Sequence, residues 1–247
     1  MSNDRARTKS VANAPTRLRD MAKLDQAVGD DIAAAASYWM LRKFQFLEAA
    51  QTEFETIVDP ALSYAKDPDI REITAYNTAF TEWLLFERPY RHGRSLLGCY
   101  IDEPPASATA DMLARLGQVV ETQRFSRFVI LDKNVATSMC ALRDTQTDRR
   151  YDVYDPHLAE VGHWRDGVIA ERVAEVDGLW LGVGQMYLYD VAPAGEVGPD
   201  GPGAIHAEDV ADGLDTSYFS FYLRLVRDTM GADGRYTPSL NIRSDES

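Results

Sequence analysis

The stretch from residue 168 to residue 189 has the sequence VIAERVAEVDGLWLGVGQMYLY. Residues 168–176 alternate in polarity as a strand does when one of its faces is buried. The dipeptide Asp177-Gly178 follows, and Asp-Gly favours the tight turn of a β-hairpin. Residues 179–189 are again rich in aromatic and aliphatic side chains. The sequence therefore predicts two antiparallel strands joined by this turn.

Three further strands are predicted upstream of this hairpin, at residues 128–131, 136–143 and 149–155. Asp132-Lys133-Asn134 is expected to form the first connecting turn. Five strands joined by short connections within about 65 residues are typical of a small antiparallel barrel. Gly182 and Gly184 lie in the last strand with no helix after them, so they indicate a bulge or tight corner rather than a nucleotide-binding loop.

The residues before the barrel have helical periodicity. Apolar side chains recur every three or four positions from residue 30 to residue 65, with Met40 on the apolar side and a break expected at Pro60. A second helix should start near Asp67-Pro68-Asp69 and stop before Pro89. Further helices are predicted at residues 94–101, 111–123 and 217–230.

The predicted fold class is α+β, with an N-terminal helical bundle, a five-stranded antiparallel β-barrel and a C-terminal helix. The expected segments are a disordered basic tail (1–27), the helical domain (28–124), the barrel (125–190), a Gly/Pro-rich and acidic linker (191–215), the C-terminal helix (216–231) and a loose tail (232–247).

The 247 residues include 26 Lys and Arg against 39 Asp and Glu, which gives a net charge of −13. Such an acidic chain is not a general binder of nucleic acid or of anionic membranes. Its first 25 residues nevertheless carry six basic side chains against three acidic ones. A basic protein is the simplest partner for the acidic remainder. With no apolar run near the ~20 residues of a membrane span and no signal-peptide core, we expect a cytoplasmic protein that does not contact a membrane.

Four segments carry a resemblance to a group of bacterial proteins of uncharacterised activity. Phe80–Pro89 (FTEWLLFERP) with Gly93–Leu97 (GRSLL) is similar to their pattern F-x-x-W-L-x-F followed by G-x-T/S-x-L. Asp144–Val153 and Asp166–Val173 resemble two phrases of the β unit that follows in these proteins. The likeness covers roughly residues 70–190 and implies a helical domain followed by a small barrel. The cysteine-rich SEC-C tail of some relatives, which binds metal, is absent here.

Searching for catalytic or metal-binding patterns gives little. Cys99 and Cys140 lie in apolar stretches and are expected to be buried thiols. His157 and His163 could contribute to a metal site in a loop, but loop histidines on the barrel rim are the simpler interpretation. Five residues of α-helix separate Glu82 from Glu87, a rotation of about 500°, which predicts different helix sides. We therefore predict no catalytic residue, no metal and no cofactor.

The best local candidate is the loop ERPYRHGR at residues 87–94. Its candidate contact residues are Arg88, Tyr90, Arg91, His92 and Arg94. These arginines either pair with local carboxylates and fix the turn, or contact an anion such as a phosphate. Arginines of the barrel that could add to such a site are Arg124, Arg127, Arg149 and Arg150. Trp164 and Trp180 are a second candidate surface, with core or rim packing as the alternative.

These observations favour a non-enzymatic binding or regulatory module that acts through protein–protein contacts. One alternative is a nucleic-acid-associated protein that uses the barrel and the Arg88–Arg94 loop. Another is an enzyme whose site is assembled from dispersed residues.

Overall fold

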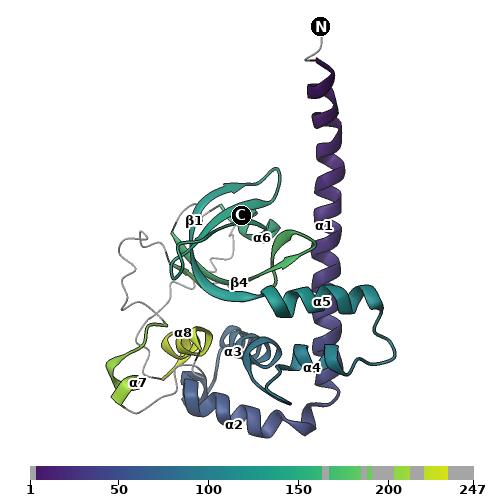
Figure 1. Ribbon diagram of the computed structural model, residues 1–247. Coiled ribbons are helices and arrows are strands. Elements are labelled where there is room, and N and C mark those ends of the chain that lie inside the picture. The colour runs from purple at the N-terminus through teal and green to yellow at the C-terminus, as the bar shows by residue number, and fades with distance from the viewer. Residues whose placement is uncertain (1–3, 163–166, 185–187, 191–202, 212–219, 233–247) are drawn as a thin grey trace.

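A computed structural model describes residues 4–162, 167–184, 188–190, 203–211 and 220–232. It is an α+β protein in which a small barrel lies beside a long first helix, with the remaining large helices packed below the barrel (Figure 1). The helices before the barrel are α1 (Asp4–Met40), the 3₁₀ turn η1 (Lys43–Gln45), α2 (Leu47–Val58), the 3₁₀ turn η2 (Ala61–Tyr64), α3 (Ile70–Glu82), the π-helical turn η3 (Trp83–Glu87), α4 (Leu96–Asp102) and α5 (Ala110–Thr122).

The later elements are β1 (Arg124–Asn134), β2 (Met139–Asp144), β3 (Arg150–Tyr154), α6 (Pro156–Glu160), β4 (Val168–Val176), β5 (Leu179–Gly182), β6 (Leu188–Asp190), α7 (Ala207–Ala211) and α8 (Phe221–Met230). Of these, α7 lies in the predicted linker. The predicted loose tail lies outside the described residues, except for Ala232.

The five-stranded barrel is confirmed, but its strands are mixed rather than all antiparallel. The ring runs β1-β2-β3-β5-β4 and closes because β4 also pairs with β1. Val153 and Tyr154 of β3 pair in parallel with Trp180 and Leu181 of β5. This parallel pairing arises because β4 pairs with β1, which leaves its hairpin partner β5 as the strand that meets β3.

The expected turn at Asp132-Lys133-Asn134 is wrong, because β1 continues through Asn134. A bulge between Ile130 and Asp132 shifts the pairing with β2 and lets the strand run on. The chain instead turns just before β2, where Ser138 adopts a positive φ of 55°.

The predicted last strand, 179–189, is divided at the glycines. Gly182 pairs with Val173 of β4, whereas Leu188 pairs with Ala170. The β5–β6 side therefore has three more residues than β4 between these pairs. A Cβ atom on Gly182 would lie 2.7 Å from Oδ2 of Asp155, so this position accepts only glycine without rearrangement.

Helix α1 runs from Asp4 to Met40, so it includes most of the segment at residues 1–27 that we expected to be a disordered tail. Val28 is buried in the main core, and Met21 and Leu24 pack against it. Further along the helix, the carboxylate of Asp31 accepts a 2.7 Å hydrogen bond from Arg115 of α5. These contacts of α1 with the main core and with α5 stabilise the helix, and the composition of the N-terminal segment does not predict them.

The other helix boundaries follow their predicted signals closely. Asp59 caps α2 in a left-handed conformation before Pro60, and Asp69 caps α3 by accepting a bond from the Arg71 amide. The predicted helix at 94–101 corresponds to α4 and that at 111–123 to α5. The π turn was not predicted. Its backbone bond from Arg88 N to Trp83 O spans five residues.

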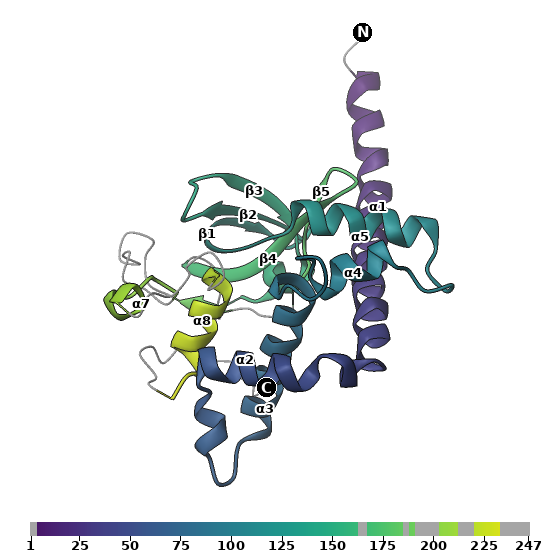
Figure 2. The same cartoon turned by 60° about the horizontal axis from the view of Figure 1, so that its bottom comes forward.

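Two hydrophobic clusters fill the molecule. One joins the helices to the outer face of the barrel, and the other lies inside the barrel around Phe128, Leu142 and Ile169. The C-terminal helix α8 lies between the barrel and helix α2 (Figure 2). It links the two halves, because Tyr222 packs on Phe125 of β1 and donates a hydrogen bond to Ala79 O of α3. No helix in the described part of the chain is both long and apolar enough to cross a membrane.

Candidate functional site

The corner between α1 and α2 exposes three large apolar side chains close together in sequence. Met40, Leu41 and Phe44 are 56%, 81% and 91% exposed, respectively. The placement of Met40 on the buried stripe was therefore wrong. The predicted pattern assumed one continuous helix through this segment. Helix α1 instead ends at Met40 and the chain turns through η1, so the apolar face of α1 does not continue past this point.

Buried aromatic residues hold this corner in place. Trp39 and Phe46 lie on either side of the turn and are both buried. The Trp39 indole NH donates a 2.7 Å hydrogen bond to Leu96 O at the start of α4. Both rings contact the ring of Tyr90 edge-on, at centroid distances of 5.6 and 5.5 Å. The corner and the predicted 88–94 loop are therefore one packed unit.

The loop itself is a tight turn. Tyr90 N donates to Arg94 O and Arg94 N donates to Arg91 O. His92 and Gly93 at its tip have positive φ angles of 52° and 73°. Non-glycine residues adopt this conformation at an energetic cost that the two backbone bonds offset.

The three loop arginines differ in their surroundings. Arg88 is mostly buried and forms a 2.7 Å ion pair with Glu53 of α2. Arg91 and Arg94 are exposed, and their closest carboxylates are Glu103 at 3.6 Å and Asp102 at 3.2 Å. Exposed pairs of this kind contribute little stability. Arg88 is therefore a structural residue, while Arg91 and Arg94 remain accessible to a partner.

Two more basic residues border the apolar patch. The Arg42 guanidinium lies 3.7 Å from the centroid of the Tyr38 ring, and Lys43 Nζ lies 5.9 Å from that of Phe44. We use the name corner surface for Met40, Leu41, Arg42, Lys43, Phe44, Arg91, His92 and Arg94. This surface combines exposed apolar groups with four basic side chains on an acidic protein, and two of these, Arg91 and Arg94, lie beside the carboxylates of Glu103 and Asp102.

The other predicted site residues lie elsewhere. Trp180 packs edge-on against Tyr151 at 4.7 Å, and Arg149 lies over both rings. Trp180 is therefore part of the barrel packing. Trp164 lies outside the described residues. Of the remaining barrel arginines, Arg124 pairs with the buried Asp144 and Arg150 pairs with Asp152, whereas Arg127 lies over the ring of Phe221. Their contacts are with the barrel and α8 rather than with the 88–94 loop.

The described residues contain no group of three or more His, Cys, Asp or Glu side chains arranged to hold a metal ion. His157 lies in α6, and His163 is outside the described part of the chain. Both cysteines are free and buried, as predicted. Burial raises the pKa of the Cys140 thiol to about 12, with a further contribution from the charge of Asp155. A thiol with this pKa is a poor nucleophile near neutral pH.

Glu82 and Glu87, which the α-helical rotation placed on different sides, both approach Arg172 of β4. Glu87 Oε1 lies 2.9 Å from the Arg172 guanidinium, and Arg172 also bonds to Gln123. The Glu82 carboxylate lies beside Gly184, where an added Cβ would contact both Glu82 and Cβ of Arg172. The five-residue backbone bond of the π turn accounts for the difference, because an α-helical rotation does not apply across it.

Comparison of the chain with family models, with curated proteins and with solved structures found no match. The resemblance of residues 70–190 to the bacterial proteins described above therefore stays a prediction.

Proposed function

We propose that the protein is a non-enzymatic binding module and that the corner surface is where it contacts a protein partner. The observation that carries this proposal is the exposure of Met40, Leu41 and Phe44 on a well-packed corner. Exposed apolar residues that are grouped and bordered by charge are typical of interaction sites. Trp39, Phe46 and Tyr90 fix the backbone beneath them, so the surface is presented in one conformation and little ordering entropy is lost on binding.

The charges of the corner surface define the partner. Arg42 and Lys43 lie between the apolar residues in the sequence, and Arg91 reaches the same corner through its hydrogen bond to Gln45. A complementary segment therefore carries aspartate or glutamate next to apolar anchors. The net charge of the whole chain suggested a basic partner, but the local charge of this surface is the opposite. We therefore propose an acidic, amphipathic protein segment as the occupant.

Nucleic acid is the alternative partner, and the experiment described next distinguishes it from a protein. A polyanion would use Arg91 and Arg94 and stack a base on Phe44, but it would extend over a body with a net charge of −13. A short acidic peptide avoids most of that repulsion because it covers only the basic patch.

The experiment immobilises the full chain and compares what it retains from an extract of the source organism with what three variants retain. Phe44→Ser removes the apolar anchor, and Arg91→Glu reverses one charge. Ile70→Ser is the matched control, because Ile70 is 71% exposed at the start of α3, away from the corner surface. A retained protein is then purified and titrated against all four chains.

We expect a partner whose affinity falls about tenfold or more with Phe44→Ser and with Arg91→Glu, and also with rising salt. Ile70→Ser should leave the affinity unchanged. Equal affinity for all four chains would refute the proposal, and so would a basic binding segment. Retention of RNA or DNA that the same variants abolish would favour the nucleic-acid alternative instead.

A further inference from the structure

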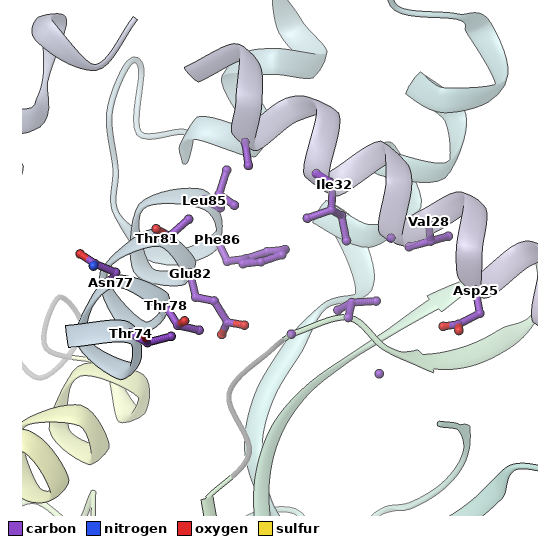
Figure 3. A pocket seen from close by; sticks show the side chains of 16 residues that line it. Asp25, Val28, Ile32, Thr74, Asn77, Thr78, Thr81, Glu82, Leu85 and Phe86 are labelled. Carbon is purple, nitrogen blue, oxygen red and sulfur yellow. The ribbon is translucent and has the colours of Figure 1, made fainter. Parts of the chain in front are cut away.

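A pocket of about 440 Å³ lies where the helical domain meets the end of β5. Its walls come from the middle of α1, from one side of α3 with the start of the π turn, and from Gly182-Val183-Gly184 (Figure 3). Its volume is within the usual range for small-molecule sites. The pocket is on a different part of the molecule from the corner surface.

Two carboxylates line this pocket from opposite walls. Asp25 projects from α1 and Glu82 from the end of α3, and Figure 3 shows them on either side of the cavity. Glu82 is only 5% exposed. A third carboxylate, that of Asp155, lies directly behind Gly182. Burial is the main cause that raises the pKa of Asp25 to about 6, and the charge of Asp155 is the second cause. The three carboxylates give the pocket acidic walls that suit a cationic ligand, with the side chain of Arg172 as the basic group next to Glu82.

The wall between the two carboxylates is apolar. Val28 and Ile32 of α1 face Phe86 of the π turn, with Val183 at the strand end. The hydroxyl and amide groups of α3 form a polar border. They belong to Thr74, Asn77, Thr78 and Thr81, which share one side of the helix at three- and four-residue spacing. A ligand that fits this pattern has a hydrocarbon middle and polar ends.

The glycines keep the carboxylates in position. A Cβ atom on Gly184 would lie 2.9 Å from Oε1 of Glu82, and one on Gly182 would lie 2.7 Å from Oδ2 of Asp155. Either side chain would displace a carboxylate from the wall that it occupies. The backbone of this segment thus forms one side of the pocket without filling it.

We propose that this pocket binds an aliphatic diamine, with one ammonium group at Asp25, the other at Glu82, and the methylene chain along Val28, Ile32 and Phe86. Ammonium groups match carboxylates in charge and donate hydrogen bonds that both carboxylates and threonine hydroxyls accept. A metal ion would leave the apolar wall uncovered, and the described residues offer no three-ligand group for one.

The test is calorimetric titration of the full chain with 1,5-diaminopentane. The comparison ligands are 1-aminopentane, which lacks one ammonium group, and 1,5-pentanediol, which lacks both charges. The diamine should bind at least about tenfold more tightly than the monoamine, and the diol should give no binding. No binding of the diamine up to about 10 mM, or equal binding of the diol, would overturn the proposal.

Variants localise the binding. Asp25→Asn and Glu82→Gln should each weaken diamine binding about tenfold or more. Asp30→Asn is the control on α1, since Asp30 is exposed and does not line the pocket. If Asp25→Asn and Glu82→Gln both leave the affinity unchanged, the ligand binds elsewhere and the proposal fails.

Because Glu82 is buried, its replacement can affect folding, and a second design avoids this difficulty. Thr78→Lys places a tethered ammonium group at the pocket and should abolish diamine binding. Glu72→Lys adds a lysine on an exposed part of the same helix, outside the pocket, and should leave binding intact. Equal binding by these two variants would count against this site. Neither result depends on whether the corner surface binds a protein.

Discussion

Arg172 is the residue at which the two halves of the molecule meet. Its side chain is fully buried and projects from the middle of β4. It bonds to Glu87 of the π turn and to Gln123 at the end of α5. Its guanidinium also lies over the rings of Phe86, Phe125 and Tyr222, at 4.5, 5.3 and 5.4 Å from their centroids. One side chain thus contacts the barrel, the helical domain and α8.

Arg172→Ala should lower the free energy of unfolding by about 3–5 kcal/mol, because it leaves a cavity and removes the partner of Glu87. Arg150→Ala is the control, since Arg150 and Asp152 form a pair exposed by more than half, and it should cost less than about 0.5 kcal/mol. Urea unfolding followed by circular dichroism measures both. A loss below about 1 kcal/mol for Arg172→Ala would contradict the role assigned to it.

Asp25 makes stability depend on pH. Burial, and then the charge of Asp155, raises the pKa of this carboxyl from 3.8 to about 6. The folded state therefore binds the proton more tightly than the unfolded chain does. The contribution of Asp25 to the free energy of unfolding is therefore fully present below pH 3.8 and is lost as the pH rises through about 6.

Asp25→Asn should consequently raise the free energy of unfolding more at about pH 7.5 than at about pH 4. The difference between the two gains should be about 1 kcal/mol, after allowance for solvent screening of a partly exposed group. Unfolding by urea at the two pH values, for the wild type and for this variant, gives the difference directly. A gain that is larger at the lower pH would show that the sign is wrong.

At the scale of elements, the strands and most helix ends were predictable from the sequence because their signals are local. Asp177-Gly178 specified the hairpin and Pro60 the end of α2. The start of α3 lies two residues later than the proline-based signal indicated, because Asp69 rather than Asp67 caps the helix. The parallel contact of β3 with β5 was not predictable, since it depends on how the ring closes. The formation of the N-terminal helix and of the π turn was not predictable either, because both depend on packing partners that are distant in sequence.

The same distinction applies to the candidate site. The basic 88–94 loop was visible in composition, but its packing on Trp39 and Phe46 was not. The exposure of Leu41 and Phe44 had no sequence signal, because apolar residues in a helical pattern are normally buried. Only tertiary structure separates Arg88, which is paired and mostly buried, from the exposed Arg91 and Arg94.

Glycines in strands and helices should respond in opposite ways to substitution. Gly182→Ala should destabilise the protein by about 1–3 kcal/mol, because the new methyl group meets the buried Asp155 carboxylate. Gly117→Ala should stabilise it by about 0.5–1 kcal/mol, since Gly117 lies within α5 and a Cβ there has no atom within 4 Å. Thermal unfolding of the two variants checks the pair. The same sign for both would contradict the close approach of Gly182 to Asp155.

At the scale of the whole molecule, helices and barrel share one core. Tyr154, Ala174 and Leu181 of the barrel lie in the same hydrophobic cluster as Trp39 and Phe54 of the helical domain. Strand β4 is buried along almost its entire length. The described parts of the molecule should therefore unfold together.

Urea unfolding should give one midpoint by tryptophan fluorescence and by far-ultraviolet circular dichroism. The circular dichroism signal comes mainly from the helices, whereas the fluorescence combines Trp39 and Trp83 of the helical domain with Trp180 of the barrel. Two separated midpoints would show that the halves are independent domains, contrary to the shared core.

We propose above that the corner surface binds an acidic segment of a protein partner. The most direct measurement places a photo-crosslinking amino acid at position 44, or at position 70 as the control, in the full chain within cells of the source organism. The crosslinked peptides are then mapped by mass spectrometry. The account predicts an adduct with an acid-rich segment of another protein at position 44 only, which Arg91→Glu with Arg94→Glu abolishes. Equal adducts at both positions, adducts with a second copy of this chain alone, or adducts with nucleic acid would contradict it.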